Sequence, residues 1–158
     1  MAKEIGLSKK EIDDLYLAAI LHDVGKIAIP HDVLGKAGKL SYDERKIIRQ
    51  HPVLSAFFIR ALEYFEGLIP SVYFHHENFD GTGYPTGLSG KEIPIGARII
   101  RVADAFDAIT HDRVYQKRRS FKEAIHELKR FSGCDFDPDI VKIFIELVKR
   151  GKVKDDKE

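Results

Sequence analysis

Apolar positions recur with the period of an α-helix along most of the chain. Between residues 8 and 23 they share one helix face, at Ile12, Leu15, Ala18, Ala19 and Leu21. No alternating pattern of the kind expected for β-strands competes with these stretches. The spacing predicts an all-α bundle, with helices over residues 8–23, 41–51, 53–66, 70–76, 95–111, 120–131 and 138–149.

Three of the predicted helices begin with a capping box, a serine followed three residues later by a glutamate. The pairs are Ser8 with Glu11, Ser41 with Glu44, and Ser120 with Glu123. In this motif the serine hydroxyl caps an unpaired amide and the glutamate carboxylate accepts from the serine amide. Prolines at positions 52, 70, 94 and 138 each stand where a first helical turn can begin.

Two stretches rich in glycine and proline interrupt the helical pattern. Residues 27–40 are expected to form an irregular connector, and residues 77–94, ENFDGTGYPTGLSGKEIP, a long structured loop. Loops of this length inside a compact domain are uncommon and usually functional. Residues 151–158 are expected to form a charged C-terminal tail, which leaves one domain over residues 1–150.

Composition narrows the class of protein. The chain has 158 residues, 44% hydrophobic and 32% charged, as expected for a single globular domain. A formal net charge of +1 gives no support for binding a nucleic acid polymer or an anionic membrane. The apolar runs are too short to cross a bilayer, and the charged start lacks a signal peptide's apolar core. One cysteine, Cys134, suits a cytoplasmic location.

Histidines and aspartates of the type that bind metals occur in four short motifs. The motifs are HDVGK with His22 and Asp23, RQHP with His51, FHHENFDGTGYP with His75 and His76, and RVADAFDA with Asp104. The histidines stand at predicted helix ends, so helices packed around one core can bring them to one centre. Nitrogen and oxygen donors without thiolate favour iron, manganese or zinc. Two such ions bridged by Asp23 could activate water for attack on phosphorus.

At these residues the chain resembles the HD-GYP subgroup of the HD superfamily of metal-dependent phosphohydrolases. The matching segments are LHDVGKIAIP, the HP at 51–52, HHENFDGTGYPTGLSGKEIP and ARIIRVADAFDAITHDRVY. The resemblance implies an HD-domain-like helical bundle with a structured GYP loop. It also implies hydrolysis of the bacterial second messenger cyclic di-GMP to pGpG and/or GMP, in signal transduction. The implied cofactors are two divalent ions, iron or manganese, with zinc as an alternative.

The resemblance also assigns roles to individual residues. The implied metal ligands are His22, Asp23, His51, His75, His76 and Asp104. Asp23 bridges the two ions, with one site completed by the three histidines from position 51 onward and the other by His22 and Asp104. The residues implied to contact the substrate are Lys26, Tyr84, Asp107 and Arg113. Lys26 also joins Asp23 as a catalytic residue, because it faces the substrate phosphate.

The chain departs from the family pattern at its start. Family members carry a preceding helix with a further metal-binding histidine, and MAKEIGLS resembles the tail of that helix. The second metal site is therefore expected to be incompletely occupied. An apolar patch around Leu17, Ile20 or Leu21 is expected to be exposed, where it would favour a homodimer.

Two single positions also differ from the family. Gln116 replaces an arginine that is common there, which lowers the expected affinity for phosphate. Ser55 replaces a common glycine, with an expected effect on packing alone.

Two other functions stay open at this point. The chain could be a catalytically weak or inactive HD-GYP module that binds nucleotide, or binds partner proteins through its GYP loop. It could also be an HD phosphohydrolase that acts on another nucleotide. Metal content and turnover separate the first alternative from an enzyme, and a substrate screen decides the second.

Overall fold

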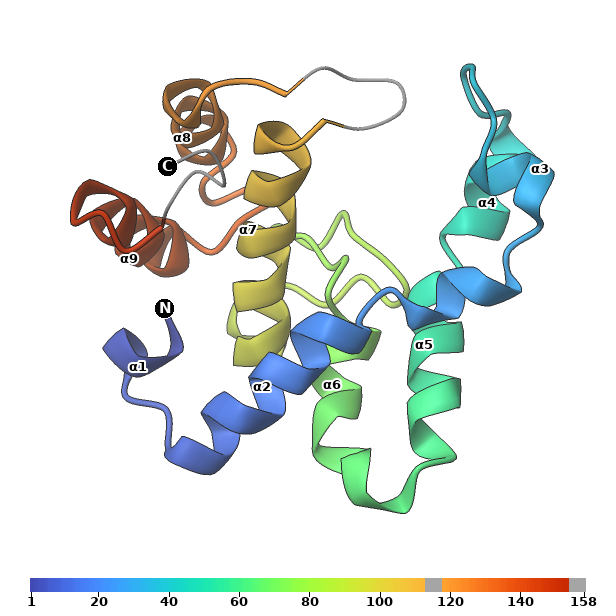
Figure 1. Ribbon diagram of the computed structural model, residues 1–158, viewed down its shortest axis with the longest axis horizontal. Helices are drawn as coiled ribbons and strands as arrows, with labels where there is room; N and C mark the ends of the chain where they lie inside the picture. The colour runs from blue at the N-terminus through green and yellow to red at the C-terminus, as the bar shows by residue number, and fades with distance from the viewer. Residues whose placement is uncertain (113–117, 154–158) are drawn as a thin grey trace.

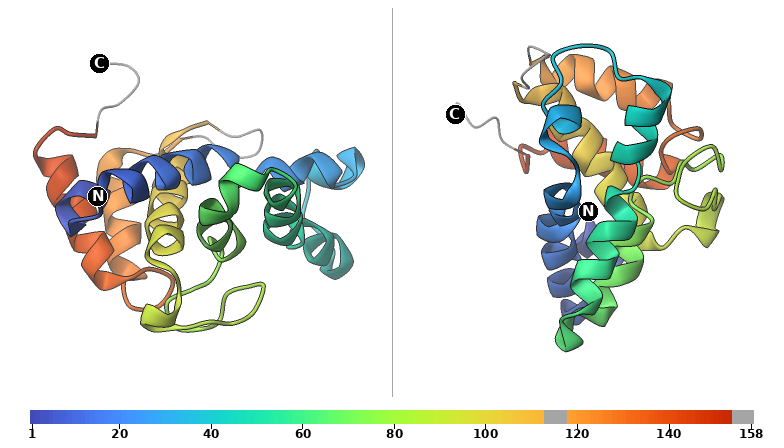
Figure 2. Two further views of the ribbon diagram at one scale, coloured as in Figure 1. Left: turned by 90° about the horizontal axis from the view of Figure 1, so that it is seen from below. Right: turned by 90° about the vertical axis from the view of Figure 1, so that its right-hand side faces the viewer.

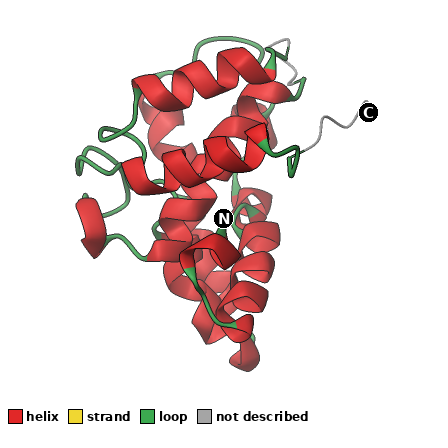
Figure 3. Ribbon diagram, turned by 90° about the vertical axis from the view of Figure 1, so that its left-hand side faces the viewer, coloured by secondary structure: helices red, strands yellow, loops and turns green. Residues whose placement is uncertain are grey.

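The computed structural model describes residues 1–112 and 118–153, and these residues form an α-helical structure (Figure 3). No β-strand occurs among them, only an isolated bridge between Ser132 and Phe136, so the all-α prediction is confirmed. The helices are α1 (Ala2–Ile5), α2 (Lys9–Leu21), α3 (His31–Leu34), α4 (Tyr42–Ile48), α5 (His51–Arg60), α6 (Ile69–Tyr73), α7 (Ile95–Thr110), α8 (Phe121–Arg130) and α9 (Pro138–Lys149). Three short 3-10 helices join them: η1 (Val24–Ala28), η2 (Glu63–Leu68) and η3 (Gly90–Glu92).

All three predicted capping boxes are present. Ser8, Ser41 and Ser120 each accept a hydrogen bond from the amide three residues on, and the glutamate there accepts one in return. Helix α9 is capped instead by Asp137, whose side chain accepts hydrogen bonds from the amides of Asp139 and Ile140. Local capping therefore sets the starts of α2, α4, α8 and α9 close to where the sequence predicts them.

Several predicted boundaries were wrong near the prolines and glycines. The stretch 27–40 is partly helical, because η1 ends within it and α3 lies inside it. The expected helix 53–66 ends at Arg60, and Glu63–Leu68 tightens into η2 before Pro70 starts α6. Pro52 lacks an amide hydrogen and is tolerated in a first helical turn. His51 therefore begins α5, whereas it was predicted to end the helix before it.

Helix α7 lies at the centre of the molecule (Figure 1), and a separate core cluster packs on each of two of its faces. One face carries Val102 and Phe106 into a cluster with residues of α8 and α9. The other face carries Ile100 into a second cluster with α2, α5, η2 and α6, formed by Ala18, Ile59, Leu68 and Val72. The long helix thus joins the C-terminal helices to the part of the fold that holds His22, His51, His75 and His76.

The N-terminal helix α1 lies beside the C-terminal helix α9 (Figure 2). Met1, Ile5 and Leu7 pack against the core cluster of α7, α8 and α9, and Arg150 pairs with Glu4 at 3.9 Å. Of the expected exposed patch on α2, Ile20 is exposed, whereas Leu17 and Leu21 pack against the second cluster. Among the described residues no helix is long and apolar enough to cross a membrane.

Candidate metal centre

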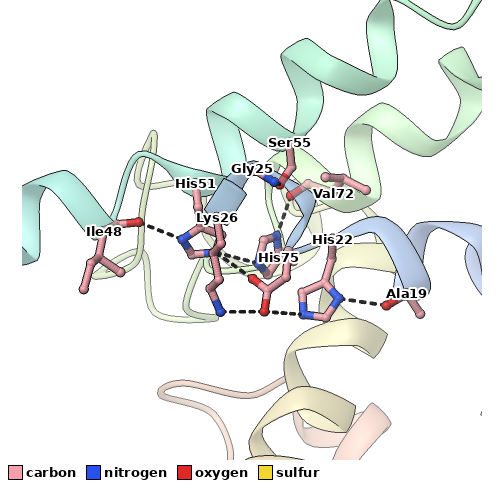
Figure 4. A network of polar contacts seen from close by, with 10 residues as sticks. Ala19, His22, Gly25, Lys26, Ile48, His51, Ser55, Val72 and His75 are labelled. Carbon is pink, nitrogen blue, oxygen red and sulfur yellow. Dashed lines mark hydrogen bonds and ion pairs between the residues drawn. The ribbon is translucent and has the colours of Figure 1, made fainter. Parts of the chain in front are cut away.

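Four of the six predicted metal ligands converge at one point. Asp23, His51, His75 and His76 each offer a ligand atom, and these atoms all lie within 4.8 Å of one another. They come from the turn after α2, the first residue of α5 and the turn after α6. Figure 4 shows His22, Lys26, His51 and His75 directed toward one another from these separate segments. His75 and His76 follow α6 instead of closing it, since α6 ends at Tyr73.

A glycine allows Asp23 to approach His51. A Cβ on Gly25 would lie 2.3 Å from the backbone oxygen of His51 and 2.5 Å from the amide nitrogen of Ser55. Only glycine permits this packing of η1 on α5. The buried Ser55 hydroxyl accepts a hydrogen bond of 2.8 Å from the Gly25 amide. The expectation that Ser55 affects packing alone was wrong, because its hydroxyl also satisfies a buried donor.

Three imidazoles are fixed in the same way, through the carbonyl three residues before each. Nδ1 of His22 lies 2.8 Å from the Ala19 oxygen, Nδ1 of His51 2.7 Å from the Ile48 oxygen, and Nδ1 of His75 2.5 Å from the Val72 oxygen. A carbonyl only accepts, so each Nδ1 carries the proton and donates it. In the neutral imidazole Nε2 then keeps a lone pair for a metal ion.

The arrangement of these free nitrogens fits a cation. Nε2 of His51 and Nε2 of His75 are 3.3 Å apart, although neither carries a proton to share when Nδ1 is protonated. Two nitrogens bound to one ion at octahedral or tetrahedral angles would be roughly 3.0–3.4 Å apart. Nε2 of His22 and Oδ1 of Asp23 are also buried without a hydrogen-bond partner. The side chains are therefore better placed to coordinate a metal ion than to hydrogen-bond to one another.

The charges at the centre favour metal binding. Burial lowers the pKa of His75 to about 3, and burial with the neighbouring His75 lowers that of His76 to about 2. Burial alone would raise the pKa of Asp23, but contacts with His22, His51 and Lys26 outweigh it and hold this pKa well below its usual range. At neutral pH the centre therefore presents an ionised carboxylate and two neutral imidazoles, the forms that ligate metals.

The other two predicted ligands lie on a more open side. His22 and Asp104 line one pocket of about 390 Å³ between α2 and α7, whose remaining walls are Leu15, Ala19, Ile99, Ile100, Ala103 and Asp107. Nε2 of His22 is 3.4 Å from Oδ2 of Asp23, so this side adjoins the four-ligand centre. The Asp23 contact outweighs burial and raises the pKa of His22. Asp107 is exposed and contacts Nδ1 of His111 at 3.0 Å.

The predicted substrate residues lie around this centre, as far as the structure describes them. Nζ of Lys26 is 2.5 Å from Oδ2 of Asp23. The ring of Tyr84 stacks on His76, with ring centroids 4.9 Å apart and planes 25° apart. Arg113 and Gln116 lie outside the described residues. Two further residues at the site, Arg49 and Glu77, were not predicted.

Both residues lie inside sequence motifs, Arg49 in RQHP and Glu77 in HHENFDGTGYP, but the motifs alone assign neither residue a role. The Arg49 guanidinium lies 5.0 Å from the Tyr84 ring centroid, and Glu77 is buried in the GYP loop. Glu77 directly follows the histidine pair, but an acidic residue in a glycine-rich loop is usually solvated. Its burial depends on contacts within the folded loop.

Comparisons with known proteins find relatives over most of the chain. The HD domain family model matches residues 1–140. A protein named cyclic di-GMP phosphodiesterase from Thermotoga maritima is 38% identical over 154 residues, covering 94% of this chain and 41% of its own length. The 3'3'-cGAMP-specific phosphodiesterase 2 of Vibrio cholerae is 36% identical over 151 residues, covering 92% of this chain and 28% of its own length.

A solved structure supports the fold independently. A cyclic GMP-AMP specific phosphodiesterase of V. cholerae superposes with a TM-score of 0.73 at 24% identity, over 94% of this chain and 41% of that one. The chain thus spans less than half the length of these relatives.

Proposed function

The chain belongs to the HD domain family, in its HD-GYP branch, and we propose on this premise that it is a metal-dependent phosphodiesterase acting on cyclic di-GMP. The observation that carries the proposal is the convergence of Asp23, His51, His75 and His76 within 4.8 Å. The proposed products are pGpG and/or GMP. The proposed domain covers residues 1–150, followed by a charged tail at 151–158, of which 154–158 lie outside the described residues.

In this proposal the centre holds two divalent ions. Asp23 would be shared by both ions, the histidines at 51, 75 and 76 would complete one site, and His22 with Asp104 would hold the other. Iron or manganese suits this donor set, and zinc is the alternative. The second site has fewer ligands from this chain and lines an open pocket. We therefore expect it to be only partly occupied at low metal concentration.

The residues of the chain prepare the site for an anionic diester. When bound, the ions supply activated water and neutralise charge on the phosphoryl oxygens. His51 and His75 hold their Nε2 atoms toward the centre through their carbonyl contacts. Lys26 is charged and half-exposed beside Asp23, so it can turn from that carboxylate to a phosphate oxygen. Tyr84 offers a half-buried ring to a base, and Asp107 and Arg113 are proposed to line the nucleotide pocket.

Cellular context is also part of the proposal. A soluble dinucleotide messenger and a single free cysteine suit a cytoplasmic protein. Exposed apolar side chains such as Ile20 offer a surface for a homodimer. The GYP loop is the proposed contact for partner proteins.

A hydrolysis assay tests the proposed function. Purified protein is incubated with cyclic di-GMP and Mn²⁺ or Fe²⁺, and products are separated by chromatography. We expect linear product with metal and none after chelation, with recovery on adding metal back. Binding of cyclic di-GMP without any turnover, at full metal occupancy, would instead identify a nucleotide-binding module.

The same assay should be run with a second cyclic dinucleotide. The V. cholerae relative is named for 3'3'-cGAMP, which differs from cyclic di-GMP in one base. Measuring kcat/KM for both dinucleotides under the same conditions shows which of them is the preferred substrate. A higher value for 3'3'-cGAMP would overturn the substrate assignment while leaving the metal centre in place.

A further inference from the structure

Glu77 is a buried acidic residue that the proposed chemistry does not use. Only 2% of its surface is exposed, although it lies in a glycine-rich loop next to the metal-binding histidines. We propose that Glu77 is a positioning residue, which holds the GYP loop so that Tyr84 stays against His76 and faces the bound substrate. The substrate-facing part of this inference rests on the proposed function, whereas the loop-holding part does not.

The carboxylate of Glu77 joins the two ends of the GYP turn. Its Oε1 accepts hydrogen bonds from the Thr86 amide at 2.7 Å, the Thr86 hydroxyl at 2.8 Å and the Gly87 amide at 3.0 Å. Its Oε2 lies 3.1 Å from the same Gly87 amide. Hydrogen bonds to a charged acceptor are roughly twice as strong as neutral ones. Three donors on one buried carboxylate make this a specific tie between positions 77 and 86–87.

The contacts of Glu77 hold the chain on both sides of Tyr84. Tyr84 donates its amide to the His76 oxygen at 3.2 Å, one residue before Glu77, and Thr86 follows Tyr84 by two residues. Between them, Gly83 passes so close that a Cβ there would lie 2.5 Å from the Cα of Glu77. The loop therefore folds directly over Glu77, and the Tyr84 ring comes to stack on His76 at 4.9 Å.

Other contacts of the loop act elsewhere. Asp80 accepts from the Thr82 amide at 2.9 Å and from the Thr82 hydroxyl at 2.6 Å, but this turn is exposed and local. Asn78 bonds Arg101 of α7 at 2.9 Å and fixes the start of the loop. Among the described residues, Glu77 is the buried side chain that connects the loop start to the segment after Tyr84.

A set of variants tests the loop-holding part by hydrogen exchange. Glu77→Ala leaves the Thr86 and Gly87 amides without their acceptor, so the peptide covering 77–94 should exchange faster. Glu77→Gln keeps one acceptor oxygen and should give a smaller increase. Asp80→Asn, in the same loop, is the matched control and should leave the Thr86 and Gly87 amides unchanged. Equal protection in all four proteins would overturn the inference.

Steady-state kinetics test the substrate-facing part. We expect Glu77→Ala to lower kcat/KM about 10- to 100-fold, mainly through KM, because a displacement near 1 Å can cost this much. Occupancy of the four-ligand metal site should stay unchanged, and Glu77→Gln should recover part of the loss. Where Glu77→Ala fails to fold, Glu77→Gln carries the comparison. A loss of metal at unchanged KM would show that Glu77 only supports the fold.

A double-mutant cycle shows whether Glu77 acts through Tyr84. If it does, Glu77→Ala should lower kcat/KM by less than about threefold in a Tyr84→Ala background. If the double variant lost the full sum of both single effects on log kcat/KM, Glu77 would not act through Tyr84. If the wild-type protein turns over no cyclic dinucleotide, the proposed function fails, and hydrogen exchange still decides whether Glu77 holds the loop.

Discussion

The two sides of the candidate metal centre differ in the number of predicted ligands that the chain supplies to each. On the closed side, His51 and His75 are buried, and a backbone carbonyl fixes each ring. On the open side, His22 and Asp104 line a pocket of about 390 Å³ with largely apolar walls. The first side depends on contacts among η1, α5 and α6, whereas the second depends on the separation of α2 and α7. In the proposed two-ion arrangement, the two ions should therefore bind with unequal affinity.

The largest expected effect comes from a ligand on the closed side. His75→Ala removes a fully buried ligand, and we expect at least about a 100-fold loss of hydrolysis together with loss of bound metal. Metal analysis and turnover measure this, with His126→Ala on the exposed face of α8 as control. A His75→Ala protein that melts like the wild type and retains both metal and turnover would contradict the assignment.

Substituting a ligand on the open side should reduce metal binding and turnover less. Asp104→Asn should weaken the second ion about tenfold and leave the first in place, because Asp104 is absent from the four-ligand group. Calorimetric titration with Mn²⁺ should show a tight and a weak event, of which only the weak event moves. Turnover of the variant should recover at high Mn²⁺. Loss of both events together would show that the two sides form one cooperative site.

Acid should also change the free energy of unfolding with opposite sign through the two sides. Burial lowers the pKa values of His75 and His76 to about 3 and about 2, so below pH about 6.5 the unfolded chain takes up protons that the folded one does not. Folding is then disfavoured increasingly as the pH falls. His22 has a raised pKa, so its protonation stabilises the folded state and offsets part of the loss.

Urea unfolding of the metal-free protein measures this balance. We expect the free energy of unfolding to fall by about 2 kcal/mol between pH 7.5 and 5.5. His22→Gln should steepen the loss, because it removes the opposing contribution. A stability that is level over this range would contradict the difference between the two sides.

The smallest effect is expected at the packing of η1 on α5. Ser55→Ala leaves the Gly25 amide without its acceptor and should lower the free energy of unfolding by about 1 kcal/mol. Turnover should stay within about twofold, because Ser55 touches no ligand side chain in the contacts described. A large loss of metal in this variant would show that the hydroxyl also sets the position of Asp23.

Much of the local structure follows from the sequence by itself. The capping boxes at Ser8, Ser41 and Ser120 and the helical period predict α2, α4 and α8 well, because both depend on residues three or four apart. The types of ligand at the centre also follow, since histidine and aspartate motifs define the donor set. The segments 27–40 and 53–66 were predicted less well, because η1 and η2 depend on packing against other helices.

Only the tertiary structure decides which ligands meet. His51, His75 and Asp23 are distant in sequence, and the glycine contact between η1 and α5 brings two of these segments together. The burial of Glu77 and the openness of the His22 and Asp104 side likewise arise from segments that fold over or stand apart from one another. The sequence pattern specifies donors and helix starts because those depend on short-range geometry. Convergence, burial and unequal completeness depend on long-range packing, which no local pattern encodes.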